Sequence, residues 1–347
     1  MKERKETPMH WTQHKEKAAG YWHVKLLLVL FRLFPVIILR VIAFPVGFFY
    51  FLFSKKARTE SGRFLQKAAP FVTQHDIEKK CRSPFGPLRH IVSFSLNLVE
   101  KLESWGGKFQ FKNIHFQNDD IEELIRELDD GKGVFLITSH IGNIELLRGL
   151  ASFNRTGVSR KTPITAIIDT KVSKNFSRML KELNPQSSMD IISAGEIGPY
   201  TAAALEEKLF IGEMVTIAGD RTAVGGYGKN IMIPFLGEDA PFSPGIFYLA
   251  ALMKAPIYFV FAIRRGDLSV LPEYDMHVHK SRVPLEPQTG PNAVEPKTGS
   301  SPLVYSRKER LAQGSLLAHS FVKLLEDYCK QNPFQWYNFY DFWAKEA

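Results

Sequence analysis

The chain has 347 residues, with 45 Lys and Arg against 36 Asp and Glu, which gives a formal net charge of +9 at pH 7. This length is enough to bury one large hydrophobic core or two modest ones. With only two cysteines, Cys81 and Cys329, the sequence excludes a disulfide framework, and no metal-ligand spacing surrounds them.

The positive charge is confined to the N-terminal part of the chain. Residues 1–67 contain 13 Lys/Arg and 4 Asp/Glu, a difference of +9, whereas residues 68–347 contain 32 of each (45 less 13, and 36 less 4). The same part contains the most apolar segment, residues 24–53. Basic and apolar residues together are typical of binding to an anionic membrane surface, so we expect membrane lipids and not nucleic acid as the partner.

The apolar segment is interrupted by Lys25, Arg32, Arg40 and two prolines. Its longest uncharged stretch, Val41–Phe53, is shorter than the about 20 residues that a spanning helix needs. The three cations fall near one helical face. We therefore expect residues 1–58 to form a membrane-anchoring segment with a kinked helix in the headgroup region. A tilted anchor with snorkelling arginines is the alternative, and a signal peptide is disfavoured because a basic stretch follows.

The rest of the chain, residues 59–347, reads as one domain that begins with helices over 59–105. We then expect strands at 108–116, 134–139, 163–169, 189–193, 214–218, 230–236 and 256–264. The expected helices lie at 119–129, 143–153, 173–183, 197–209, 244–254 and 307–331. This alternation predicts an α/β fold with a mixed, largely parallel central sheet flanked by helices. Residues 283–303 are rich in Pro, Gly, Ser and Thr and are expected to form a mobile loop.

Residues suited to acid–base chemistry follow the expected strand at 134–139. His140 lies where this strand gives way to a helix, and Glu145 lies on the first turns of that helix. A carboxylate held against one ring nitrogen fixes the tautomer and leaves the other nitrogen as a general base. The alternative is a histidine that merely caps a helix beside a surface glutamate.

Two further groups are expected near the same site. Asp220 and Arg221 follow the strand at 214–218, so in a parallel sheet they lie at the same edge as His140, where ligands of α/β proteins bind. The alternative for this pair is a purely structural ion pair. Ser243 and Gly245 open a helix, whose free N–H groups suit an anion or an oxyanion. P-loop, G-x-S-x-G and dinucleotide-binding motifs are all missing from the sequence.

In this order, the motifs resemble those of the lysophospholipid acyltransferase superfamily, and most closely its lipid A biosynthesis (late) acyltransferase branch. The marks are His-x4-Glu at His140 and Glu145, the pair Asp220-Arg221, the Phe-Leu-Gly…Ala-Pro-Phe-Ser-Pro-Gly block over 235–245, and Ala255-Pro256. The aromatic tail at 334–343 and the N-terminal apolar segment also look like those of the family. The resemblance covers roughly residues 11–343.

The resemblance implies that His140 takes the proton of an acceptor hydroxyl as it attacks an acyl thioester, while Glu145 orients His140. Asp220 and Arg221 would bind the acceptor, with Arg221 holding an anion of it. N–H groups near Ser243 and Gly245, or at Asn143 and its neighbour, would stabilise the oxyanion. Acyl carrier protein (ACP) or coenzyme A thioesters are the expected co-substrates, without a metal or other cofactor. The expected location is the cytoplasmic face of a bacterial inner membrane.

Several alternatives remain open at this point. The family members that acylate lipid A precursors tend to have more basic residues around the acceptor, whereas residues 68–347 are neutral, so the acceptor is either such a glycolipid or another lipid or hydrophobic hydroxylated metabolite. A non-catalytic lipid-binding membrane protein and a hydrolase that uses water are the other classes. Four cations at helix spacing, Lys171, Lys174, Arg178 and Lys181, form either a solvated face or a docking surface for ACP.

Overall fold

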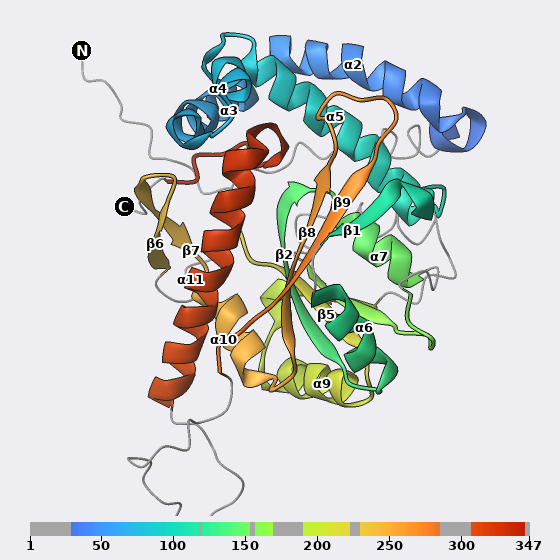
Figure 1. Ribbon diagram of the computed structural model, residues 1–347, viewed down its shortest axis with the longest axis vertical. Coiled ribbons are helices and arrows are strands. Elements are labelled where there is room, and N and C mark those ends of the chain that lie inside the picture. The colour runs from blue at the N-terminus through green and yellow to red at the C-terminus, as the bar shows by residue number, and fades with distance from the viewer. Residues whose placement is uncertain are drawn as a thin grey trace, which may run out of the picture.

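The protein is built on a seven-stranded sheet with helices on both faces (Figure 1). The computed structural model describes residues 29–117, 120–152, 157–168, 190–222, 230–284 and 307–343. The strands are β1 (Ile114–Gln117), β2 (Val134–Gly142), β3 (Ile164–Ile168), β4 (Asp190–Ser193), β5 (Met214–Ala218), β6 (Ile231–Phe235), β7 (Glu238–Phe242), β8 (Ile257–Arg264) and β9 (Tyr274–Lys280). The helices are α2 (Val36–Phe53), α3 (Lys55–Ala68), α4 (His75–Arg82), α5 (Gly86–Trp105), α6 (Asp120–Asp129), α7 (Glu145–Ser152), α9 (Pro199–Phe210), α10 (Pro244–Leu252) and α11 (Arg307–Gln331).

The strand order in the main sheet is β1-β9-β8-β2-β5-β3-β4, and β6 and β7 form a separate antiparallel hairpin. Within the main sheet only β8 and β9 pair antiparallel, and every other neighbouring pair is parallel. The expected α/β fold with a mixed, largely parallel sheet is therefore confirmed. Because β2 lies between β8 and β5, its C-terminal end is flanked by two parallel strands, and a site at this edge can draw residues from each of them.

Successive side chains of the central strands enter two different cores. Phe135 and Ile137 of β2 face a layer formed by α9, α10 and α11, whereas Val134 and Leu136 face α6 and α7. Every residue of β8 is buried. Such a strand, covered on both faces, has the continuous apolar sequence that predicted it.

A third core lies at one end of the molecule, where α2 runs alongside α5 (Figure 1). Only Leu39, Ala43 and Gly47 of α2 are buried, and Gly47 lets the helix approach Val92 and Ser95 of α5 closely. By length and composition alone α2 is apolar enough to cross a membrane. Because α2 packs along α5, the part of the expected anchoring segment from residue 36 onward shares a core with the rest of the chain, and the expected boundary at residue 58 falls inside α3.

The alternative of a tilted anchor with snorkelling arginines does not hold for Arg40. Its side chain is only 11 % exposed and turns toward α5, where Nε donates to Glu103 Oε1 at 2.8 Å. One guanidinium nitrogen also donates to the carbonyl oxygen of Val270 at 3.1 Å. A buried cation needs a paired anion, so Arg40 is a structural tie between α2 and α5 and is not available to headgroups.

Two strands were missed by the sequence interpretation, for different reasons. β7 contains a proline and two acidic residues, and it exists because Leu236 and Gly237, with φ of 50° and 83°, turn the chain back onto β6 as a hairpin. β9 has the period-two pattern of a half-buried strand, with Tyr274 and Met276 buried on one side. The expected helix at 173–183, the basic stripe from Lys171 onward and nearly all of the expected loop at 283–303 lie outside the described residues.

Candidate active site

A bulge at the end of β2 places His140. Between Thr138 and Gly142 the chain advances four residues while the paired strand β8 advances two, from Val260 to Ala262. Gly142 has φ +64°, and a Cβ there would lie 1.8 Å from the carbonyl oxygen of Ala262. Only glycine fits this approach. The extra residues carry His140 out of the regular pairing and aim its side chain at the sheet edge.

The neighbour on the other side of β2 brings Asp220 to the imidazole. Thr138 pairs with Ala218 in the parallel register of β2 and β5, so His140 and Asp220 each lie two residues beyond the last pair. His140 Nδ1 lies 2.7 Å from Asp220 Oδ1, and the His140 backbone N–H donates to Asp220 Oδ2 at 2.7 Å. Because a carboxylate can only accept, Nδ1 carries the proton and Nε2 presents its lone pair.

The surroundings keep this pair in the protonation states that a general base needs. Asp220 is fully buried, which raises its pKa, but contacts from His140 and from the Trp336 indole outweigh burial and leave the pKa of Asp220 below its usual value. Burial and the charge of Arg221 lower the pKa of His140, opposed by Asp220. The His140 side chain is 30 % exposed. The site therefore has a neutral imidazole at neutral pH that a second molecule can reach.

Glu145 begins a helix, as expected, but its carboxylate is not the one that contacts His140. The carboxylate on His140 Nδ1 belongs to Asp220, whereas Glu145 Oε2 accepts a hydrogen bond from Trp105 Nε1 at 2.8 Å. Glu145 is the first residue of α7 and is almost fully buried, so its charge also lies at the positive end of that helix. Asp220 is in contact with three donors, and the acceptor binding expected for it stays a prediction. The catalytic role expected for Glu145 stays a prediction.

Asn143 follows the bulge of β2, and Arg221 follows Asp220 directly. The Asn143 N–H, one of the expected donors to an oxyanion, donates to the carbonyl oxygen of Ala262 at 2.9 Å. It is therefore not available for an oxyanion. Its side-chain amide is fully buried, and within the described residues neither polar atom has a hydrogen-bond partner. Buried amides are ordinarily hydrogen-bonded, so this one is an exception within the described residues. Arg221 is partly buried, with its guanidinium 5.7 Å from the centroid of the Tyr340 ring.

Ser243 and Gly245 lie at the start of α10, as expected. Ser243 is the N-cap residue and is buried, whereas Gly245 is exposed in the first turn. The hairpin that leads into this helix packs on the C-terminal aromatic segment, with the rings of Phe235 and Trp336 5.2 Å apart. The assignment of the α10 N–H groups to an oxyanion stays a prediction.

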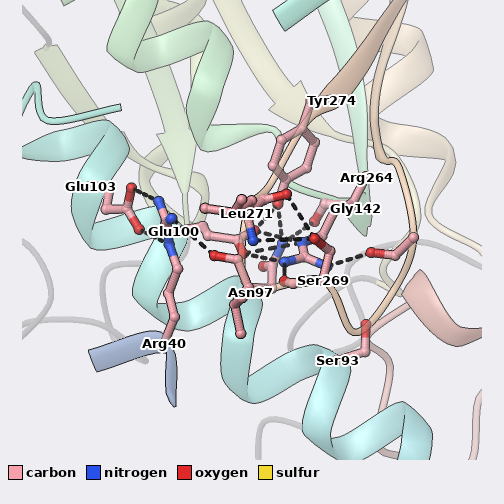
Figure 2. Close-up of polar contacts among 12 residues, drawn as sticks. Arg40, Ser93, Asn97, Glu100, Glu103, Gly142, Arg264, Ser269, Leu271 and Tyr274 are labelled. Carbon is pink, nitrogen blue, oxygen red and sulfur yellow. Dashed lines mark hydrogen bonds and ion pairs between the residues drawn. The ribbon is translucent and has the colours of Figure 1, made fainter. Parts of the chain in front are cut away.

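A buried polar network supports the Gly142 turn from below (Figure 2). Asn97 Nδ2 on α5 donates to the carbonyl oxygen of Gly142 at 3.1 Å. One turn further along α5, Glu100 forms an ion pair with Arg264 of β8, and Arg264 Nε donates to Glu100 Oε2 at 3.0 Å. The Tyr274 hydroxyl donates to the same carboxylate. The Glu100 and Arg264 side chains have no exposed surface. A pair buried this completely is costly to break, and it holds α5, β8 and β9 together behind the turn.

Gln335 and Trp336 also hold the strands of the site in place. Gln335 exchanges two hydrogen bonds with the backbone of Arg264: Oε1 accepts from its N–H at 2.8 Å, and Nε2 donates to its carbonyl at 2.7 Å. Trp336 Nε1 donates to Asp220 Oδ2 at 2.9 Å. Sequence reasoning singled out this aromatic segment but assigned it no role, because nothing local in it indicates a distant carboxylate.

No family model matches the chain, and no curated protein matches it either. Across the part of the chain that the structure describes, no group of three or more His, Cys, Asp or Glu residues is arranged to hold a metal ion. What the fold and the site define is an α/β protein with a histidine–aspartate pair at the carboxyl edge of its sheet. Such a pair can accept a proton from a hydroxyl or a water molecule at Nε2 of His140.

Proposed function

We propose that the protein is a membrane-associated acyltransferase that moves a fatty acyl chain from an acyl thioester to a hydroxyl group of a lipid. The observation that carries this proposal is the state of His140. Its Nδ1 is held 2.7 Å from a fully buried Asp220, and the ring is partly open to solvent. Among the described residues no side chain is hydrogen-bonded to Nε2, so this general base is available to an external hydroxyl.

In the proposed reaction the acceptor oxygen attacks the thioester carbonyl while His140 Nε2 takes the hydroxyl proton. The new C–O bond forms first, the C–S bond then breaks, and the proton held by His140 passes to the departing thiolate. Asp220 stabilises the imidazolium in between, since it is ionised and already bonded to Nδ1. Helix α10 begins with N–H groups that lack partners within the helix, and these are the proposed donors to the oxyanion.

The sequence resemblance supports acyl carrier protein thioesters as donors and a glycolipid similar to a lipid A precursor as acceptor. Arg221 is the proposed contact for an anionic group of the acceptor, because it follows Asp220 directly and acts on His140 electrostatically. The buried amide of Asn143 is a second proposed contact. Transfer to another lipid or hydroxylated hydrophobic metabolite would use the same residues with a different acceptor.

The proposed partner of α2 is an anionic bilayer, at the cytoplasmic face of a bacterial inner membrane. One face of the helix is tied to α5, so the helix lies along the protein and we place its outer face in the membrane plane. That face carries large exposed apolar side chains: Ile37, Ile38, Val41, Ile42, Val46, Phe48, Phe49, Tyr50, Leu52 and Phe53. Burial of such a surface contributes about 25 cal/mol per Å² to binding, and the lysines that open α3 provide attraction to anionic headgroups.

The direct test is turnover by the purified protein. We would incubate it in anionic vesicles with acyl carrier protein thioester and candidate lipid acceptors, and identify acylated lipids by mass spectrometry. Lipid profiles of cells with and without the gene would name the natural acceptor. We expect one acylated product that is lost with His140→Ala. Release of free fatty acid without a lipid product would instead indicate a hydrolase, and binding without turnover would indicate a lipid-binding protein.

Membrane attachment has its own test with a matched control. Phe49 on α2 is 54 % exposed, and Phe210 at the end of α9 is 86 % exposed. We expect Phe49→Asp to reduce co-flotation with anionic vesicles, whereas Phe210→Asp leaves it unchanged. Equal behaviour of the two variants would contradict the assignment of α2 to the membrane.

A further inference from the structure

Trp336 contacts Asp220 of the histidine–aspartate pair, from a part of the chain more than a hundred residues away. Its side chain is fully buried, and Nε1 donates to Asp220 Oδ2 at 2.9 Å. That oxygen also accepts the His140 backbone N–H at 2.7 Å, while Oδ1 faces Nδ1 at the same distance. The carboxylate is thus fixed by three donors, and the indole is the only one of them that does not belong to His140.

The backbone around Trp336 is attached to the same strand end. Trp336 forms an antiparallel bridge with Ile141, and the N–H of Tyr337 donates to the carbonyl oxygen of His140 at 3.4 Å. On its other side the Trp336 carbonyl oxygen lies 3.1 Å from His90 Nε2, and Ser61 Oγ lies 2.9 Å from His90 Nδ1.

His90 acts here as a neutral donor to the segment. It is fully buried, and burial lowers its pKa to about 3. A neutral ring that donates from Nε2 to the Trp336 carbonyl accepts a hydrogen bond from the Ser61 hydroxyl at Nδ1. The chain is therefore held from both sides at the one residue whose indole reaches Asp220.

We infer that Trp336 is a positioning residue of the site, which fixes the rotamer of Asp220 and moderates its charge toward His140. This inference rests on the proposed function, in which His140 is the base. Packing alone does not require it, because the rings of Phe64, Phe235 and Phe342 surround Trp336 and a phenylalanine would fill much of the same space. The indole N–H supplies what a phenylalanine lacks.

Two effects are expected when this N–H is removed. Oδ2 keeps one donor, so the carboxylate can rotate away from the geometry that orients Nδ1. The remaining negative charge on Asp220 is less compensated, so the imidazolium is favoured and the pKa of His140 rises. The charged groups that act most on the pKa of His140 are Asp220 and Arg221 after β5 and Lys101 on α5. The substitution of Trp336 leaves Arg221 and Lys101 in place, so the shift reports on Asp220.

The test compares Trp336→Phe with Trp343→Phe. Trp343 belongs to the same aromatic cluster, with its ring 6.2 Å from that of Trp336, but its indole Nε1 donates to the carbonyl oxygen of Phe235 at 3.4 Å and not to Asp220. We expect Trp336→Phe to lower kcat about tenfold with KM nearly unchanged, as for loss of one hydrogen bond to a charged group. The acidic limb of its pH–rate profile should move to higher pH, and that of Trp343→Phe should not.

A titration of His140 by NMR, in protein labelled at histidine nitrogens, measures the same shift without any substrate. If the wild-type protein lacks acyl transfer, the proposed function fails while the titration still tests Trp336. If Trp336→Phe folds and titrates like the wild type, the inference is wrong. If it does not fold, native Cys329 permits ligation of a synthetic peptide that carries benzothienylalanine at position 336, in which a sulfur atom replaces the indole N–H. An unchanged His140 titration in that protein would equally overturn the inference.

Discussion

Replacement of Asp220 by asparagine changes one atom and has an outcome that follows from the hydrogen bonds around it. Two donors meet at Oδ2, from the His140 backbone and the Trp336 indole at 2.7 and 2.9 Å, and one meets at Oδ1. The amide oxygen of asparagine accepts two hydrogen bonds at the Oδ2 position but only one at the Oδ1 position, so we expect it to occupy the Oδ2 position. Its NH₂ group then faces His140 Nδ1, which must accept a hydrogen bond instead of donating one.

The imidazole proton is thereby moved to Nε2, the nitrogen that receives the acceptor proton in the proposed reaction. General-base catalysis is worth about 10²–10⁴-fold, and a histidine fixed in the wrong tautomer loses most of it. We expect Asp220→Asn to lower kcat about 10³-fold, with little change in KM because the side-chain volume is kept. The tautomer is read directly from the ¹⁵N shifts of the His140 ring. A rate within tenfold of wild type, with Nδ1 still protonated, would refute this reasoning.

Glu145→Gln is the matched comparison. The Trp105 indole can still donate to the glutamine oxygen, so this hydrogen bond is kept. We expect a loss smaller than tenfold. If Glu145→Gln instead matches Asp220→Asn, then Glu145 acts on His140 as the sequence motif suggested, and the role given to Asp220 must be revised.

Further predictions concern the charges near His140 and the buried groups that hold the Gly142 turn. Arg221→Gln removes a charge that lowers the pKa of His140, so that pKa should rise and the acidic limb of kcat/KM should move to higher pH. Asp220→Asn removes a charge that raises it and should move the NMR titration of His140 the opposite way. Glu100→Gln leaves the Arg264 guanidinium buried beside a neutral group, so it should reduce the free energy of unfolding by about 3–5 kcal/mol in denaturant titration. Gly142→Ala should abolish turnover or folding, because its Cβ would meet backbone and not a flexible side chain.

Much of the fold could be predicted from the sequence because the central strands are long apolar runs. β2, β3, β5 and β8 lie within a few residues of the expected ranges. The period-two pattern of β9 was equally readable in the printed sequence. The hairpin strand β7 could not be read in this way, since its pairing depends on a turn at Leu236 and Gly237 and not on its own composition.

The site was predicted in its parts but not in its pairing. His140 and Asp220 were both expected at the carboxyl edge of the sheet, yet Glu145 was chosen as the partner because it is close in sequence. The actual contact depends on β2 and β5 being neighbours in register, which is a property of strand order. Once two parallel strands are aligned at Thr138 and Ala218, residues at equal offsets meet. Trp336 and Asn97 depend on packing over still longer separations, for which a single sequence holds no periodic signal.

The position of α5 has a consequence for the distance between His140 and a bilayer. One side of this helix carries α2, through Gly47 and the Arg40–Glu103 pair, and another side holds the Gly142 turn through Asn97. If α2 rests on lipid as proposed, helix α5 sets the height of His140 above the membrane surface. A lipid hydroxyl that reaches this height can react, and one buried at another depth cannot, whatever its chemical identity. Depth in the membrane would then select the acceptor hydroxyl before any side chain recognises it.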